Sequence, residues 1–129
     1  MPNTITQDTV MGAAGNNVVV RRIVIVSDGS EESDLVIFDR STFDSLTTSG
    51  RIMRIQADGS SCQCLLEWDA TTDVAAYAFD PSNQIDRDFR AYGGLVNNGG
   101  TGATGDLLLT TTNLDSGDVV TIIITFYLN

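Results

Sequence analysis

The most regular hydrophobic pattern in the chain is the alternation over Gly117–Leu128 (GDVVTIIITFYL). Alternate residues of a β-strand point to opposite faces of a sheet, so one face of this segment is wholly apolar, with Val120, Ile122, Ile124, Phe126 and Leu128. The opposite face is also largely apolar, with Val119, Thr121, Ile123, Thr125 and Tyr127. The pattern therefore predicts a strand in the middle of a sheet, whose second face is covered by another layer or by another subunit.

Shorter alternating segments predict further strands, separated by turn-forming residues. Val18–Ser27 is the longest of them, and its neighbours Arg21 and Arg22 point to opposite faces. Each of these arginines is expected to pair with a carboxylate near a sheet edge. The other predicted strands are Leu35–Phe38, Val74–Phe79, Ile85–Tyr92 and Leu107–Thr111. The expected turns and loops between strands include Arg40–Gly50, Asp80–Asn83 and the glycine-rich Gly93–Gly105.

The dipeptide Asp58-Gly59 predicts a β-hairpin, because it supplies the positive φ angles of a two-residue primed turn. Such a turn pairs Arg51–Ala57 with Ser60–Trp68 and sets Ala57 opposite Ser60. The expected buried face of this hairpin consists of Met53, Ile55, Cys62, Cys64, Leu66 and Trp68.

About eight strands and no convincing helix are typical of an all-β, antiparallel β-sandwich. A jelly-roll-like arrangement is the natural one for this count, and a seven-stranded immunoglobulin-like sandwich is the alternative. Residues 1–17 are polar and interrupted by Gly12 and Gly15, so they predict an extended N-terminal arm. Such an arm is either a frayed end or a segment that reaches over a neighbouring subunit. Residues 18–129 are then the sandwich domain.

The composition excludes most enzyme classes. Among 129 residues there are 7 basic side chains, all of them Arg, against 17 acidic ones, and there is no His and no Lys. The chain therefore has no imidazole base, no His-ligated zinc and no Schiff-base or phosphate-loop lysine. We expect no enzyme and no cofactor; a hydrolase that uses carboxylates alone is the remaining enzymatic alternative.

The net charge of −10 also narrows the range of partners. Its field repels phosphate backbones, so a nucleic acid partner is not expected. No apolar run is long enough to span a membrane, and no secretory signal is visible at the N-terminus, so we expect synthesis in a cytoplasm.

Two local clusters invite a metal interpretation. Cys62 and Cys64 share one face of their predicted strand, where they are expected to be reduced core residues. A thiolate metal site there would need two more ligands, which only a symmetry axis could supply. The acidic turn Asp28–Asp34 is either a solvated turn or a site for a hard cation such as calcium.

The candidate interface residues lie in two segments. Asp86, Arg87, Asp88 and Arg90 alternate in charge, a pattern that suits either ion pairs within the chain or a self-complementary contact between subunits. The outer positions of the C-terminal strand, Val119, Ile123 and Tyr127, are candidates for the same contact.

Three stretches of the C-terminal half carry a resemblance: Leu65–Phe79 (LLEWDATTDVAAYAF), Asp88–Gly100 (DFRAYGGLVNNGG) and Thr101–Leu128 (TGATGDLLLTTTNLDSGDVVTIIITFYL). Their EWDATTDV-like turn, FR-x-x-GGL element and TGDLLLTT…GD-V-T-I strand pair resemble a group of small virion proteins of tailed bacteriophages, in the same order. The polar N-terminal segment and the CQC pair have no counterpart in that group.

The resemblance implies a structural virion protein made in the host cytoplasm. It would be a decoration or cement protein on the outer capsid surface that binds the major capsid protein and bridges neighbouring capsomers, as a homotrimer at a threefold position. The resemblance brings no catalytic residues. The alternative is a lectin-like glycan-binding module of a phage tail or fibre, for which Tyr77 and Tyr92 are the available aromatic side chains, since Trp68 is predicted to be buried.

Overall fold

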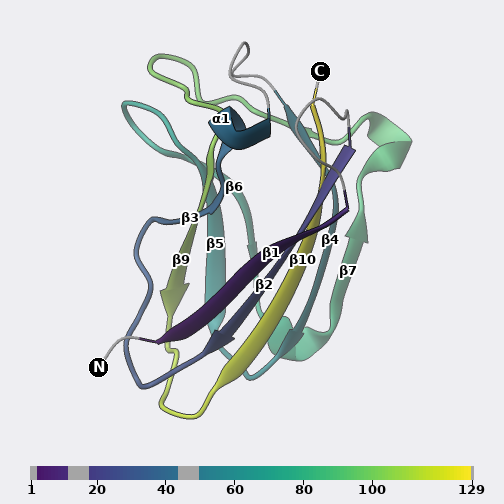
Figure 1. Ribbon diagram of the computed structural model, residues 1–129. Helices are drawn as coiled ribbons and strands as arrows, with labels where there is room; N and C mark the ends of the chain where they lie inside the picture. Colours follow the sequence, from purple (N-terminus) through teal and green to yellow (C-terminus); the bar gives the residue numbers. More distant parts are fainter. Residues whose placement is uncertain (1–2, 12–17, 44–49, 129) are drawn as a thin grey trace.

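The computed structural model describes residues 3–11, 18–43 and 50–128, and these form two antiparallel sheets packed face to face (Figure 1). The larger sheet, sheet A, has the order β1-β2-β10-β4-β7, with β8 also beside β4. The smaller sheet, sheet B, has the order β3-β9-β5-β6. The strands are β1 (Thr4–Met11), β2 (Val18–Val26), β3 (Leu35–Phe38), β4 (Arg51–Gly59), β5 (Gln63–Trp68), β6 (Val74–Phe79), β7 (Ile85–Asp88), β8 (Leu95–Val96), β9 (Leu107–Thr112) and β10 (Val119–Tyr127).

The strand pairing is that of a jelly roll. The antiparallel pairs β2–β10, β3–β9, β4–β7 and β5–β6 are nested one inside the other along the chain. This is one long hairpin folded over into two sheets, which brings β2, β10, β4 and β7 into one layer and β3, β9, β5 and β6 into the other. The expected all-β sandwich is confirmed, with ten strands in the described part of the chain instead of about eight.

The core lies between the two sheets and follows the alternation in the sequence. In β10 the inward side chains Val120, Ile122, Ile124 and Phe126 are at most 1% exposed. Phe126 stacks on Phe38 of sheet B, with ring centroids 4.1 Å apart. A buried aromatic pair of this kind contributes beyond its apolar area, so it helps to join the two sheets.

The predicted hairpin around Asp58-Gly59 is wrong, because β4 belongs to sheet A and β5 belongs to sheet B. Gly59 is the last residue of β4 and lies opposite Val120, so the chain crosses from one sheet to the other after it. The two strands bury their apolar faces against each other across the core, and their backbone bonds go to strands distant in the sequence. Burial of this apolar surface outweighed the local preference of Asp58-Gly59 for a hairpin turn.

Most of the predicted buried face of that segment is nevertheless correct. Cys62, Cys64, Leu66 and Trp68 are at most 3% exposed. Met53 is the exception, because an irregularity opposite Thr125 and Phe126 adds one residue to β4. Ile52 and Ile55 therefore both point inward, while Met53 is only partly buried.

The N-terminal segment is not a separate arm over its described length. Residues Thr4–Met11 form β1, the edge strand of sheet A, which pairs with β2 from Thr4 opposite Val26 onward. Ile5 packs against the core, so this segment belongs to the body of the sandwich. Its threonines and Ile5 favour a strand, a signal that its polar composition concealed. The rest of the predicted arm, residues 1–2 and 12–17, lies outside the described residues.

The loops and turns predicted between the strands are confirmed only in part. Arg40–Gly50 begins with a short helix, α1 (Arg40–Phe43), and residues 44–49 lie outside the described residues. The turn at Asp80–Asn83 is present as a 3₁₀ turn, η1 (Pro81–Asn83), which Asp80 caps by accepting from the Ser82 backbone N–H. The predicted strand Ile85–Tyr92 ends at Asp88 and continues into a second 3₁₀ turn, η2 (Arg90–Tyr92).

We expect Gly59→Ala to destabilise the fold by about 1–3 kcal/mol, because a Cβ at this position, where φ is +143°, would lie 2.2 Å from the Val119 carbonyl oxygen. Gly117→Ala is the matched control, since Gly117 also has a positive φ of +90° but open space around its Cβ position. Urea unfolding of the two variants measures the difference. Equal stabilities would contradict a close approach of β4 and β10 at Gly59.

Candidate interface on the outer face of the larger sheet

The candidate residues of the C-terminal strand lie on the outer face of sheet A. Val119, Ile123 and Tyr127 alternate with the buried residues of β10, and no layer of the described chain covers them. Val119 is 41% exposed and Tyr127 is 37% exposed. We call this outer face of sheet A, formed by β1, β2, β10, β4, β7 and β8, the A face.

The neighbouring strands extend this apolar surface. Cross-strand partners point to the same side of a sheet, so the outward residues of β2 flank those of β10. These β2 residues are Val18, Val20, Arg22, Val24 and Val26. Of the six large apolar side chains that are most exposed among the described residues, four lie on the A face: Val26, Val96, Val119 and Tyr127. Exposed apolar side chains gathered on one sheet face indicate an interaction surface.

Three arginines on the A face or at its edge, Arg22, Arg54 and Arg90, form ion pairs with aspartates of the same chain. Arg22 meets Asp8 of β1 through two contacts, Nε to Oδ1 at 3.1 Å and Nη2 to Oδ2 at 2.5 Å. Arg54 meets Asp86 in the same two-pronged way, at 2.9 and 2.8 Å. Each guanidinium donates two hydrogen bonds to one carboxylate, a geometry that holds both side chains flat along the sheet surface.

Asp86 and Asp88 lie on the A face, opposite Gln56 and Arg54. Asp88 accepts from Arg90, which follows it in η2. Arg87 points to the other side of β7 and donates from Nε to the Tyr77 hydroxyl of sheet B at 3.3 Å. Of the two interpretations of this charge pattern, the described structure therefore contains the ion pairs within the chain, and it brings three of the four residues together on one side.

The arginines keep these carboxylates ionised. A hydrogen bond from Arg54 lowers the pKa of Asp86, and hydrogen bonds from Arg90 lower the pKa of Asp88 to about 2. The ion pairs in turn raise the pKa of Arg54 and of Arg90. A carboxylate with a lowered pKa is a poor proton donor, so Asp86 and Asp88 serve here as partners in fixed ion pairs.

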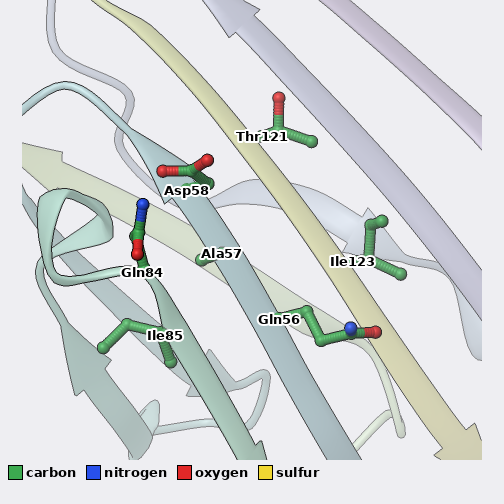
Figure 2. A pocket seen from close by; sticks show the side chains of 7 residues that line it. All are labelled: Gln56, Ala57, Asp58, Gln84, Ile85, Thr121 and Ile123. Atoms are coloured by element: carbon green, nitrogen blue, oxygen red, sulfur yellow. The ribbon is translucent and has the colours of Figure 1, made fainter.

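A shallow groove runs along the A face beside β10 (Figure 2). Its volume is about 230 Å³, and its walls come from β10, from the end of β4 and from the start of β7. The lining residues are Gln56, Ala57, Asp58, Gln84, Ile85, Thr121 and Ile123. A second depression of about 490 Å³ shares Asp58 and Thr121 with it. The groove lies where β7 begins, at Ile85 opposite Ala57 of β4.

The two predicted arginine pairings differ in outcome. Arg22 pairs with a carboxylate, Asp8, as expected. Arg21 does not: it donates to the Ile37 carbonyl oxygen at 3.1 Å and to the side chains of Gln7 and Thr9. Burial lowers the pKa of Arg21, while the charge of Asp8 opposes this shift. Arg21 thus ties β1 and β2 to β3 of the other sheet.

The acidic turn Asp28–Asp34 uses its carboxylates to hold the chain together. Glu31 accepts from the Leu114 backbone N–H and from the Thr111 hydroxyl. Glu32 accepts from the Asn3 amide at 2.6 Å, and Asn3 also donates to the Ser30 carbonyl oxygen. Among the described residues, no group of three or more Cys, Asp or Glu side chains could hold a metal ion.

Cys62 and Cys64 are both free and buried, with their sulfur atoms 3.8 Å apart. Burial raises the pKa of both thiols. A protonated, buried thiol behaves as a small apolar side chain, which agrees with the expected core role.

No known protein family matches the chain, and no curated protein matches it. Within the described residues, no helix is long and apolar enough to cross a membrane.

The sequence located the β10 part of the A face and the β7 residues Asp86 and Asp88, but missed the part formed by β1, β2 and β4. The alternation of Val18–Val26 gave a signal for its outward valines, yet nothing local placed β2 beside β10. The groove depends on where β7 begins relative to β4, which has no local signal. Asp8 was missed as the partner of Arg22 because its segment was assigned to an arm.

We expect the Asp88 side chain to titrate with a pKa of about 2, below its ordinary value of 3.8. The folded state stabilises the ionised form, so this contribution to stability is present above pH 4 or so and is lost as the pH falls towards 2. Arg90→Gln should return the pKa of Asp88 towards 3.8, whereas Arg87→Gln, on the other side of the strand, should move it less. Carboxyl NMR shifts followed against pH measure both. An unchanged pKa in Arg90→Gln would contradict this pairing.

We expect both thiols to resist an aromatic disulfide reagent at pH 8 in the folded protein and to react quickly in denaturant, because they are buried and their pKa values are raised. Absorbance of the released thiolate counts the reacted cysteines. Fast reaction of either thiol without denaturant would contradict the burial of this pair.

Proposed function

We propose that this chain is a structural protein of a virus particle, a decoration or cement protein that lies on the outer surface of the head and bridges neighbouring capsomers. The observation that carries the proposal is the A face, where outward apolar side chains of β2 and β10 lie among ion pairs formed within the chain, on an otherwise acidic molecule. Such a face suits protein association, because its apolar residues can be covered while the pairs Arg22–Asp8 and Arg54–Asp86 stay intact. Its partners would be the major capsid protein and other copies of the chain.

The jelly roll is compatible with this role but does not establish it. Jelly rolls occur in viral capsid proteins and in lectins alike, and a fold alone does not assign a function. The resemblance of the C-terminal half to small phage virion proteins favours the capsid role between these two. The proposal requires no cofactor and no catalytic residue.

The distribution of charge suits an outer position on the particle. The turns β2–β3, β4–β5, β6–β7 and β9–β10 lie together at one end of the sandwich (Figure 1). Residues 27–34, 59–62, 80–84 and 113–118 of these turns hold seven carboxylates and no arginine. A purely anionic end is disfavoured next to packaged DNA, and facing solvent it would keep particles apart by repulsion.

A glycan-binding module is the second candidate, because the outer face of sheet B has a hollow of about 460 Å³. Polar side chains surround it, and Leu65 and Ala78 contribute apolar surface. The polar ones are Gln63, Asp80, Thr110 and Thr112. Two aromatic side chains are not available to stack on a sugar. Trp68 is 2% exposed, and Tyr77 contacts Arg87 and the ring of Phe89.

We expect the purified protein to co-sediment with empty phage heads that lack it, in a saturable manner, and to be absent from the pellet when heads are omitted. Quantitative gel densitometry of pellet and supernatant measures the bound fraction. A glycan array probed with the same labelled protein separates the two candidates. Protein that stays in the supernatant with heads but binds an oligosaccharide on the array would replace the capsid role by the lectin role.

A further inference from the structure

Three surfaces of the described chain differ in charge. The turns at one end carry only acids, as described above. The outer face of sheet B has Asp34 and Glu67 near each other, both within 3.5 Å of the Thr110 hydroxyl oxygen. Burial raises the pKa of Glu67, and the nearby charges of Asp34 and Asp73 raise it further. Copies of the chain would repel one another through either of these surfaces.

The A face is different because its charges balance. Four aspartates and four arginines lie on it or at its edge: Asp8, Asp58, Asp86 and Asp88 with Arg22, Arg51, Arg54 and Arg90. The whole −10 charge of the chain therefore resides elsewhere. Two copies of this acidic molecule can approach closely through the A face without like-charge repulsion at the contact.

The size of the A face is sufficient for a stable contact. Its five main strands, spaced at about 4.8 Å, give a width of about 24 Å. The central strands β2, β10 and β4 have nine residues each, or a length of about 30 Å. Because β7 has only four residues, the resulting area is about 600 Å², at the lower end of the range for one side of a specific protein interface.

We infer that the A face of one molecule packs against the A face of a second copy about a two-fold axis. The inference rests on the proposed function and specifies the partner of the same surface. A contact made by one surface on both molecules is closed after two copies, whereas the threefold arrangement implied by the resemblance needs two different surfaces on each copy. The pair is a building unit that would then attach to the shell.

A two-fold axis that lies in the contact plane, at right angles to β10, lays each strand of the A face over the same strand of the second copy. It lays the outward valines of β2 and the outward residues of β10 over those of the second copy. The pairs Asp8–Arg22 and Arg54–Asp86 stay together in their own chains. The groove beside Ile123 leaves room for a side chain that protrudes from the opposite face.

The test compares two single substitutions at sites of equal exposure. Val26 on the A face and Val36 on the outer face of sheet B are both 44% exposed. Sedimentation equilibrium of the full chain at micromolar concentration is expected to show a dimer. Val26→Asp should raise its dissociation constant by about a hundredfold or more, because each dimer then buries two unpaired carboxylates. Val36→Asp should leave it within about twofold. Circular dichroism checks that each variant is folded. If Val26→Asp does not fold, Val119→Asp, at the position opposite Val26, takes its place in the comparison.

Ionic strength gives an independent readout. Because the contact centres on the apolar residues of β2 and β10 and the charges of the A face balance, added salt should tighten the dimer by screening the repulsion between two −10 chains. A dimer that dissociates in salt, or that is weakened equally by both substitutions, would overturn the inference. So would a trimer, or a monomeric wild-type protein. A monomer that still co-sediments with heads, and loses this binding in Val26→Asp, would leave the proposed function standing and assign the A face to the shell.

Discussion

The fold depends on the placement of the C-terminal strand β10 between β2 and β4. It pairs with β2 from Val119 opposite Val26 to Tyr127 opposite Val18, and with β4 over nearly the same length. Its inward side chains fill the core, where Phe126 stacks on Phe38 of the other sheet. Because both neighbours of β10 come from the first half of the chain, sheet A is complete only when the two halves of the sequence have come together.

This central position exposes the second face of β10 together with that of β2. A strand with apolar residues on both sides satisfies one side within the jelly roll and leaves the other side in contact with water, at a cost of about 25 cal/mol for each Å². The surrounding ion pairs, Arg22–Asp8 and Arg54–Asp86, place charge at the margins without demanding a charged partner. Burial of the apolar part of the A face is therefore favourable and needs little electrostatic complementarity, which agrees with the proposed role in assembly.

The charge of the molecule is segregated along the same lines. Acids without arginine occupy the turns at one end, whereas arginine-to-aspartate pairs occupy the A face. Net charge opposes association in general, so its removal from one broad face directs association to that face. In the proposed role, the same separation leaves an anionic end towards solvent and a neutral face towards protein.

The sequence by itself determined the all-β class, the positions of most strands and the identity of the core, because alternation of apolar residues reports which side of a strand is buried. It also located the outward residues Val119, Ile123 and Tyr127. Only the tertiary structure decided which strands are neighbours. The Asp58-Gly59 signal pointed to a hairpin, yet β4 pairs with β10 and β7, since larger apolar burial across the core outweighed a local turn preference. The partner of Arg22, the groove beside Ile123 and the balance of charge on the A face all follow from that long-range pairing, which no local pattern encodes.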